Sequence, residues 1–551
     1  MEKILRTFSE YKWFLLLWGL INIVQAAYTN LHFDEAYYWL YSTILSWGYF
    51  DHPPMVAVVG RIGDLISHST LGLRLVPIIM GLFVMLGILH LAGRQHQKFH
   101  LILYVISFPL ITSHIAGFLI LPDAPLCFFF VFFLLAYRRY LECDSISHSL
   151  ILSLAVAGMV YSKYHAVLIL FFTILANFSL LSKRSFWLVA LCSTTFLLPH
   201  FYWQFQNDFP SILYHVDTRT SGFSINNFLE YIGGQLLLAG PFSGLLVIYM
   251  AIKFKPQNTF ENTLKYIAIG FYIFFLLYCF RSRIEAHWTS VSMIALIVVS
   301  YLHFLRSGTF KKIMPYLIYP AVILIIISRF VLAGDHLEES LRLKSNFVNM
   351  EKWANELDSI SGGVPILFTN KYQDLSIYSY AKNQIMPAAP RVGSRFSQVD
   401  LYRIDSLYDG HRVLALSFGN ELKWQSKNQL RHYASFIDSY YSYTGIVMDD
   451  INIVQTDSIP FLSFNLRNMT HKNRLFQWDS TQRLKLDYSV NGHAYTVFID
   501  ELDQMQKIGP FETINYSIAL SEKLENKIKV KVALTSNNLR VYNDSYYQRL
   551  K

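Results

Sequence analysis

The sequence predicts a polytopic α-helical membrane protein with a water-soluble C-terminal region. The composition is 53% hydrophobic and only 15% charged, with a mean hydropathy of +0.30, whereas soluble domains are about 25% charged. The apolar residues up to residue 333 form a series of long runs. From residue 334 to 551 the sequence has the mixed pattern of an ordinary water-soluble chain.

About eleven apolar runs are predicted to cross the bilayer, since a span needs about 20 residues. The run Trp13–Ala27 lacks a small-residue cleavage site, so we expect a retained span rather than a removed signal peptide. The predicted spans are 12–28, 73–93, 101–120, 121–137, 149–163, 164–181, 186–204, 228–252, 265–280, 287–305 and 313–333.

The distribution of Lys and Arg predicts the orientation of these spans. Alternate connections are rich in basic residues, as cytoplasmic loops are. The remaining connections, among them 31–54 and 204–227, and the C-terminal region are then extracytoplasmic. This topology accounts for the net charge of +9, which therefore indicates no nucleic-acid partner. The basic connections hold Arg94 and Lys98, Arg138 and Arg139, Lys183 and Arg184, Lys253 and Lys255, and Arg306, Lys311 and Lys312.

The segment 31–72 is predicted to be a first extracytoplasmic loop with interfacial helices. Its first part, LHFDEAYYWLYSTILSWGYFDHPP (31–54), combines acids, histidines and many aromatic residues. Its second part, 55–72, interrupts apolar residues with Arg61, Asp64 and His68, which is too polar for a span and typical of a helix in the interface plane.

The C-terminal region 334–551 is predicted to have two parts. In 340–448, VPILFTN and HRVLALSFG are typical of buried strands and QDLSIYSYAKN of a helix, which indicates an α/β unit. In 450–551, short alternating runs such as RLKLDYSV indicate antiparallel strands. This region has no cysteine, so it must be stable without disulfides. The chain has no P-loop or GxGxxG motif, which argues against a nucleotide-driven pump.

Asp34 and Glu35 are the first candidate catalytic residues. Adjacent carboxylates are costly near a membrane, so a function is expected of them. We predict a general base that takes a proton from an incoming hydroxyl. The alternative is a helix cap, with Asp34 before AYYWLY.

Asp123 is the third candidate, a single acid at the corner LILPDAPLCFFF between two apolar runs. An ionisable residue there is costly and indicates a functional site. Its alternative is the N-cap of a helix at a proline-defined turn.

A basic group is predicted to bind phosphate. Arginine grips phosphate through paired N–H donors, which suits a lipid phosphate at the membrane edge. A snorkelling residue at the end of a span is the alternative for the lysine. The group comprises Lys163, His165, Arg281, Arg283 and His287.

His52, in DHPP, and Tyr38 are further candidates for substrate binding. A lone loop histidine can also lack any role. The aromatic residues around Tyr38 fit both an interfacial belt and stacking against a sugar ring.

The ordered set of HFDEAYYWLYSTILSWGYFDHPP, PDAPL, SKYHAVL and RSRIEAHW resembles glycosyltransferase family 39. That family includes protein O-mannosyltransferases and the bacterial aminoarabinose transferase of lipid A. The resemblance covers roughly residues 10–305. It implies a GT-C membrane fold for residues 1–333.

The resemblance also implies a function: transfer of a sugar from a polyprenyl-phosphate donor to an envelope acceptor, which is lipid A, a glycan or a protein. Asp34 and Glu35 match the acidic pair of the first loop, with Asp34 as base, and Asp123 matches the acid of the Pro-Asp corner. A metal requirement is not implied. The expected location is the bacterial inner membrane, with the site and the C-terminal region periplasmic.

Two alternatives to the enzyme remain open at this point. A flippase for polyprenyl-linked sugars would also combine many spans with intramembrane charges, but it predicts inverted repeats, which the sequence does not show. The second alternative is a non-catalytic scaffold, whose C-terminal region binds envelope components.

Overall fold

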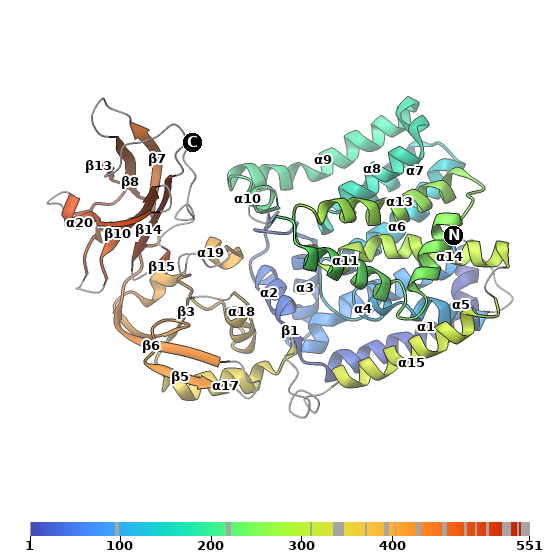
Figure 1. The fold of residues 1–551 in the computed structure, drawn as a ribbon, viewed down its shortest axis with the longest axis horizontal. Helices are drawn as coiled ribbons and strands as arrows, with labels where there is room; N and C mark the ends of the chain where they lie inside the picture. Colours follow the sequence, from blue (N-terminus) through green and yellow to red (C-terminus); the bar gives the residue numbers. More distant parts are fainter. Residues whose placement is uncertain are drawn as a thin grey trace. The chain divides into compact units, whose positions relative to one another are not determined.

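The computed structural model describes residues 2–93, 98–215, 222–308, 311–333, 347–369, 372–390, 396–402, 404–425, 431–454, 460–478, 482–490, 493–502, 506–520, 530–536 and 539–540. The chain forms two compact units (Figure 1). The first comprises Met1–Leu337 together with the short segment Asn346–Val348, and the second contains the residues from Asn349 onward.

The first unit is helical. Among the residues that the structure describes, six helices are long and apolar enough to cross a bilayer: α4, α6, α9, α13, α14 with the turn before it, and α15. The helices are α1 (Glu2–Tyr28), α2 (Phe33–Thr43), α3 (Met55–Ile66), α4 (Thr70–Leu91), α5 (Lys98–Ile106), α6 (Asp123–Glu142), α7 (Ile146–Ser162), α8 (Ala166–Ala176), α9 (Arg184–Gln206), α10 (Pro210–Leu213), α11 (Ile225–Leu238), α12 (Gly244–Lys253), α13 (Thr259–Tyr278), α14 (Ser290–Ser307) and α15 (Met314–Leu332).

Two predicted spans are not continuous helices. In 101–120, helix α5 ends at Ile106 and a 3-10 turn follows at Pro109–Thr112, because proline cannot donate the helical hydrogen bond. In 228–252, helices α11 and α12 are separated at Gly240, whose φ of 128° is accessible mainly to glycine, and at the proline after it. Hydropathy alone does not detect either break.

The loop 31–72 contains the helices α2 and α3. His32 and Glu35 form a capping box at the start of α2: the Nδ1 atom of His32 accepts from the amide of Asp34, and Glu35 Oε2 accepts from the amide of His32. The alternative that Asp34 caps this helix is therefore wrong. Along α3, Val58, Leu65 and other apolar side chains are exposed, as expected of a helix in the interface.

Helix α15 lies along α1 (Figure 1). Arg329 in α15 donates from Nη2 to Asn22 Oδ1 at 2.8 Å and from Nε to Gln25 Oε1 at 3.2 Å. All three side chains are buried. These bonds pair two of the three guanidinium nitrogens of an arginine within an apolar helix, and they fix α15 to the first helix of the chain.

The second unit has an α/β part and a β-rich part. The predicted helix is α18 (Tyr372–Ala381), and the strands order as β3-β4-β6-β5, with β3 and β4 parallel and the other pairs antiparallel. In the β-rich part, the sheets β13-β8-β7 and β11-β10-β14-β15 share one hydrophobic core. The bounds are α17 (Met350–Ser361), β3 (Ile366–Phe368), α19 (Gln398–Tyr402), β4 (His411–Leu416), β5 (Leu422–Gln425), β6 (Arg431–Tyr440), β7 (Ile446–Val454), β8 (Phe461–Asn468), β9 (Arg474–Leu475), β10 (Leu484–Val490), β11 (His493–Phe498), α20 (Ile499–Leu502), β12 (Lys507–Ile508), β13 (Thr513–Ala519), β14 (Val530–Ser536) and β15 (Leu539–Arg540).

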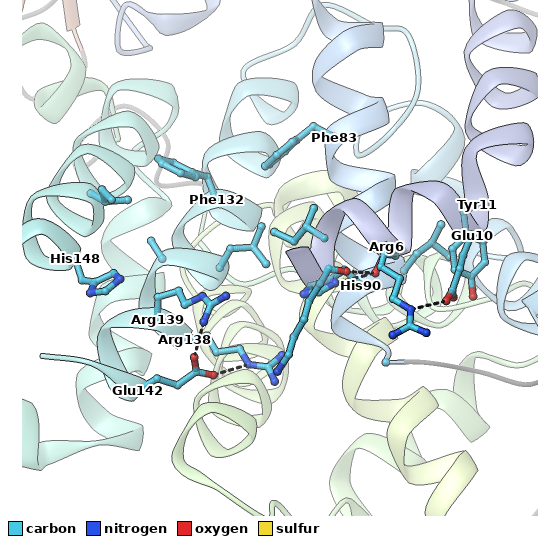
Figure 2. A pocket seen from close by; sticks show the side chains of 18 residues that line it. Arg6, Glu10, Tyr11, Phe83, His90, Phe132, Arg138, Arg139, Glu142 and His148 are labelled. Carbon is cyan, nitrogen blue, oxygen red and sulfur yellow. Dashed lines mark hydrogen bonds and ion pairs between the residues drawn. The ribbon is translucent and has the colours of Figure 1, made fainter. Parts of the chain in front are cut away.

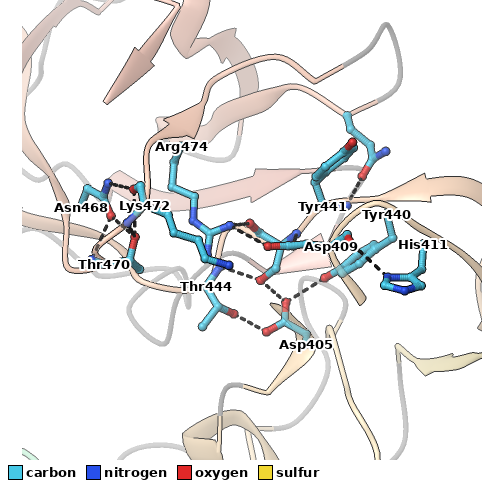
Figure 3. Close-up of polar contacts among 12 residues, drawn as sticks. Asp405, Asp409, His411, Tyr440, Tyr441, Thr444, Asn468, Thr470, Lys472 and Arg474 are labelled. Atoms are coloured by element: carbon cyan, nitrogen blue, oxygen red, sulfur yellow. Dashed lines mark hydrogen bonds and ion pairs between the residues drawn. The ribbon is translucent and has the colours of Figure 1, made fainter. Parts of the chain in front are cut away.

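A buried carboxylate joins the two parts of the second unit (Figure 3). Asp405 accepts from Tyr440 Oη at 2.8 Å, from Ser442 Oγ at 2.5 Å and from the hydroxyl of Thr444. Nearby, Arg474 donates to Asp409 at 3.1 Å and to the carbonyl of Ser442. The network fixes the chain between β6 and β7, where the α/β sheet gives way to the β-rich part.

Candidate functional site

Asp123 and Lys163 form a buried ion pair at one end of the helical unit. Lys163 Nζ lies 2.9 Å from Asp123 Oδ2, and the two side chains are 6% and 3% exposed. The hydroxyl of Ser290 donates to the other carboxylate oxygen. Asp123 is the first residue of α6, but its side chain makes no capping bond, so the N-cap alternative is wrong. Snorkelling is likewise wrong for Lys163, which is buried and paired.

Histidines surround this ion pair. His52, His114, His165 and His287 each interact electrostatically with both Asp123 and Lys163. The rings of His114 and His287 stack with their centroids 5.2 Å apart. The four side chains come from four separate segments, and each is partly exposed, so they present imidazole nitrogens around a buried charge pair.

Two of these histidines have an unused buried nitrogen. Nδ1 of His52 and Nδ1 of His165 are buried, and neither has a hydrogen-bond partner within the described part of the chain. Burial lowers the pKa of His52 to about 4, so this side chain is neutral at pH 7. A neutral imidazole with an unpaired nitrogen is free to bind a hydroxyl or a phosphate oxygen.

Tyr38 lies against His52, with the ring centroids 5.5 Å apart in an edge-to-face arrangement. It packs among the aromatic rings of α2 and is buried. Its neighbour Tyr41 donates its hydroxyl to Asp51, and burial together with the charge of Asp51 raises the pKa of Tyr41 well above its usual value. Tyr38 and His52 therefore lie in contact with each other, within the group of aromatic side chains of α2.

Glu35 links the first loop to the Pro-Asp corner. It is fully buried, and Arg74 grips it with Nε–Oε1 at 2.8 Å and Nη2–Oε2 at 2.6 Å. The amide of Ile120, three residues before Asp123, donates to Glu35 Oε1 at 3.2 Å. Arg74 also donates to the carbonyls of Ala26, Thr29 and Asn30. Glu35 therefore has the contacts of a positioning residue.

Asp34 has a different environment. Its side chain is 41% exposed, and Oδ2 lies 3.8 Å from Nδ1 of His32. His32 in turn interacts electrostatically with His114 and His287. His32 therefore lies next to Asp34 and within electrostatic range of two of the histidines around Asp123 and Lys163. Of the two adjacent carboxylates, Asp34 is therefore accessible and Glu35 is buried.

Arg281 and Arg283 are not part of the buried cluster. Both are exposed, and Arg283 lies 3.6 Å from Glu230, a pair in which both side chains are 61% exposed. His287, four residues after Arg283, is the member of this segment that reaches the ion pair. The predicted basic group is therefore divided between the cluster and the surface.

Sequence reasoning missed Arg74, His114 and Ser290. A single basic residue in the apolar run TLGLRLVP is costly in a membrane and would have indicated Arg74. His114 likewise interrupts LITSHIAGF, whereas Ser290 carries no signal in the sequence. Within the described residues, no group of three or more His, Cys, Asp or Glu side chains is placed to hold a metal ion.

Comparisons with known proteins agree with this architecture. Residues 51–203 match the family model of dolichyl-phosphate-mannose-protein mannosyltransferases. ArnT from Cupriavidus metallidurans has the same fold, both in the apo state (TM-score 0.53, 12% identity, 74% of this chain and 93% of ArnT) and bound to undecaprenyl phosphate (TM-score 0.54, 12% identity, 78% and 98%). The predicted resemblance to glycosyltransferase family 39 is confirmed.

The GT-C type of fold and the β-rich C-terminal region are likewise confirmed. A relative is the lipid A galacturonosyltransferase RgtD of Rhizobium johnstonii, which is 24% identical over 296 residues. The aligned part is 51% of this chain and 61% of that relative, so the chain matches less than two thirds of the relative's length.

Proposed function

We propose that this chain is a membrane glycosyltransferase that moves a sugar from a polyprenyl-phosphate donor to a hydroxyl of a lipid A-type acceptor. The similarity to a lipid A galacturonosyltransferase and to ArnT supports the class of reaction. The observation that carries the proposal is the buried Asp123–Lys163 pair, which histidines surround and whose corner is hydrogen-bonded to Glu35, the neighbour of the accessible carboxylate Asp34.

The proposed reaction is a single displacement. Asp34 takes the proton of the acceptor hydroxyl, whose oxygen then attacks the anomeric carbon. The bond between that carbon and the phosphate oxygen breaks on the opposite face, so the anomeric configuration inverts. The polyprenyl phosphate leaves with the bonding electrons.

Lys163 stabilises the charge that develops on this phosphate. Asp123 holds the lysine in place, and burial makes its positive charge more effective than it would be in water. We assign Glu35 to positioning of the first loop. His52, His165 and His287 bind sugar hydroxyls or phosphate oxygens, and Tyr38 contacts the sugar. Arg281 and Arg283, being exposed, attract the donor phosphate at an earlier stage.

We place the site and the second unit on the extracytoplasmic face of a bacterial inner membrane. The distribution of basic residues along the sequence supports this orientation. We also propose that residues 1–333 carry the catalytic machinery, and that 334–551 is a soluble region in two parts.

The deciding experiment gives purified protein in liposomes a radiolabelled polyprenyl-phosphate sugar and lipid A. The wild-type protein should transfer label to lipid A, and Asp34→Asn should lower the rate by about 10²–10⁴-fold, the usual contribution of a general base. The matched control is Asp64→Asn, a carboxylate in α3 that contacts His68, which should transfer at the wild-type rate.

Two outcomes would overturn this proposal. Movement of intact donor across the bilayer without transfer would identify a flippase instead. Full activity of Asp34→Asn at normal protein levels would remove Asp34 as the base.

A further inference from the structure

A cavity lies at the end of the helical unit opposite the candidate active site. It has a volume of about 710 Å³ and is lined by α1, α4, α6 and α7 (Figure 2). Asp123 begins α6, while Arg138 and Arg139 near the other end of that helix line the cavity. A helix of 20 residues is about 30 Å long, so the two sites lie near opposite faces of a bilayer.

The other helices agree with this placement. Helix α4 begins near Arg74, which holds Glu35, and ends with His90 in the cavity. Helix α7 begins near His148 in the cavity and ends next to Lys163. The cavity is therefore separate from the site proposed for sugar transfer.

The cavity is basic. Four cations line it, Lys3, Arg6, Arg138 and Arg139, against the two acids Glu10 and Glu142. Arg6 and Arg138 contact these acids through Nε, at 3.8 and 3.4 Å. Arg139 Nη1 also donates to Glu142 Oε2, at 3.1 Å. The cavity thus holds three guanidinium groups against two carboxylates, and a guanidinium fork suits a phosphate.

An apolar groove of about 450 Å³ continues from the cavity, and Phe83 lines both. The groove runs between α1 and α4, past residues from Phe8 to Ile23 of α1. Those residues rise about 22 Å along the helix, and one leaflet is about 15 Å deep. The groove is long enough for a complete acyl chain.

A basic connection alone would satisfy the rule that sets membrane topology. That rule requires only basic residues in a connection, and it does not account for a hollow of this volume between four helices. Surrounded by lipid, a basic hollow that opens into an apolar groove has the shape and charge of an anionic lipid site.

We propose that this cavity and groove bind one anionic glycerophospholipid, with its phosphate among Arg6, Arg138 and Arg139 and one acyl chain between α1 and α4. The cations neutralise the headgroup, and the acyl chain lies in the apolar groove along the seam between α1 and α4. The inference stands independently of the proposed transferase activity.

Native mass spectrometry of the delipidated full-length protein in detergent tests this inference. The protein should bind phosphatidylglycerol more tightly than phosphatidylcholine, and 0.5 M salt should weaken the binding. Arg6→Gln and Arg139→Gln should each weaken it about fivefold, the contribution of one basic residue at an anionic lipid surface. Arg184→Gln, an exposed arginine that begins α9 outside the cavity, should have no effect.

A second measurement needs no variant. Phosphatidylglycerol with a photoreactive acyl chain should label peptides that contain residues 8–23 of α1 or 82–86 of α4. Equal binding of phosphatidylcholine, labelling elsewhere, or no binding would overturn the inference. Binding of undecaprenyl phosphate in place of phosphatidylglycerol at this cavity would replace the proposed ligand.

Discussion

Two buried ion pairs, Arg74–Glu35 and Lys163–Asp123, differ in how completely their hydrogen bonds are used. Arg74 donates to both oxygens of Glu35 and to three backbone carbonyls. Around the Lys163–Asp123 pair, by contrast, His52 and His165 each keep a buried Nδ1 that has no partner among the described residues. An ion pair whose hydrogen bonds are all made within the protein stabilises the fold. Unpaired polar atoms beside a buried charge instead indicate a binding site for a ligand.

The largest effect is expected at the Arg74–Glu35 pair. Arg74→Met should lower the free energy of unfolding by about 3–5 kcal/mol, because it leaves Glu35 buried and unpaired. The double variant Glu35→Gln/Arg74→Met should not recover the loss, since the three carbonyls still lack a donor at about 1–3 kcal/mol each. Thermal unfolding in detergent measures both, and recovery by the double variant would contradict the architectural role.

For the Lys163–Asp123 pair, the double variant should have the opposite result. Lys163→Met alone should also destabilise by about 3–5 kcal/mol, through the unpaired Asp123. Here Asp123→Asn/Lys163→Met should recover most of the stability, because a neutral pair needs no compensating charge. Sugar transfer should stay lost in both variants. A stable double variant that retained transfer would show that the lysine has no role in the reaction.

Asp405 extends the comparison to a buried carboxylate that, among the described residues, is held by three hydroxyls and by no cation. Asp405→Ala should cost about 1–3 kcal/mol, because three hydroxyl groups lose their acceptor. Asp405→Asn keeps one acceptor oxygen and should cost less. Chemical unfolding followed by tryptophan fluorescence measures the difference, and equal losses would show that shape alone matters there.

The last prediction concerns protonation of His52, whose effect appears only at acidic pH. Its pKa is about 4 in the folded chain against an ordinary 6.5, so the unfolded chain binds more protons between these values. Stability should therefore fall as the pH drops from about 6.5 to about 4. His52→Gln should flatten this part of the profile of melting temperature against pH. An unchanged profile would mean that His52 titrates normally.

The sequence was sufficient for the candidate residues but not for their partners. Asp123 and Lys163 each stood out because charge is costly between apolar runs. Their pairing depends on how α6 and α7 pack, which spacing along the chain does not encode. Arg74 lies inside the predicted span 73–93, so its ion pair with Glu35 was not predicted. The catalytic assignment of Glu35 stays a prediction.

Local patterns predicted the second unit well at the level of elements. The segments VPILFTN and HRVLALSFG contain β3 and β4, and QDLSIYSYAKN overlaps all of α18 except its first residue, because alternation and residue type suffice for short strands and helices. The irregular segment after Ile106 was predicted to be a span, since its apolar content conceals Pro109. Hydropathy indicates that a segment is buried in lipid or protein, but it does not indicate whether the backbone of that segment is a continuous helix.

The smallest sheet of the protein has a consequence for how the chain can be cut. Leu31 and His32 pair with Phe347 and Val348, and the rings of His32 and Phe347 lie 5.1 Å apart. A truncated chain that stops after the last apolar helix would lack this strand, and the histidine next to Asp34 would lose one of its supports. An expression boundary beyond residue 348 keeps the strand and the first loop as a single piece.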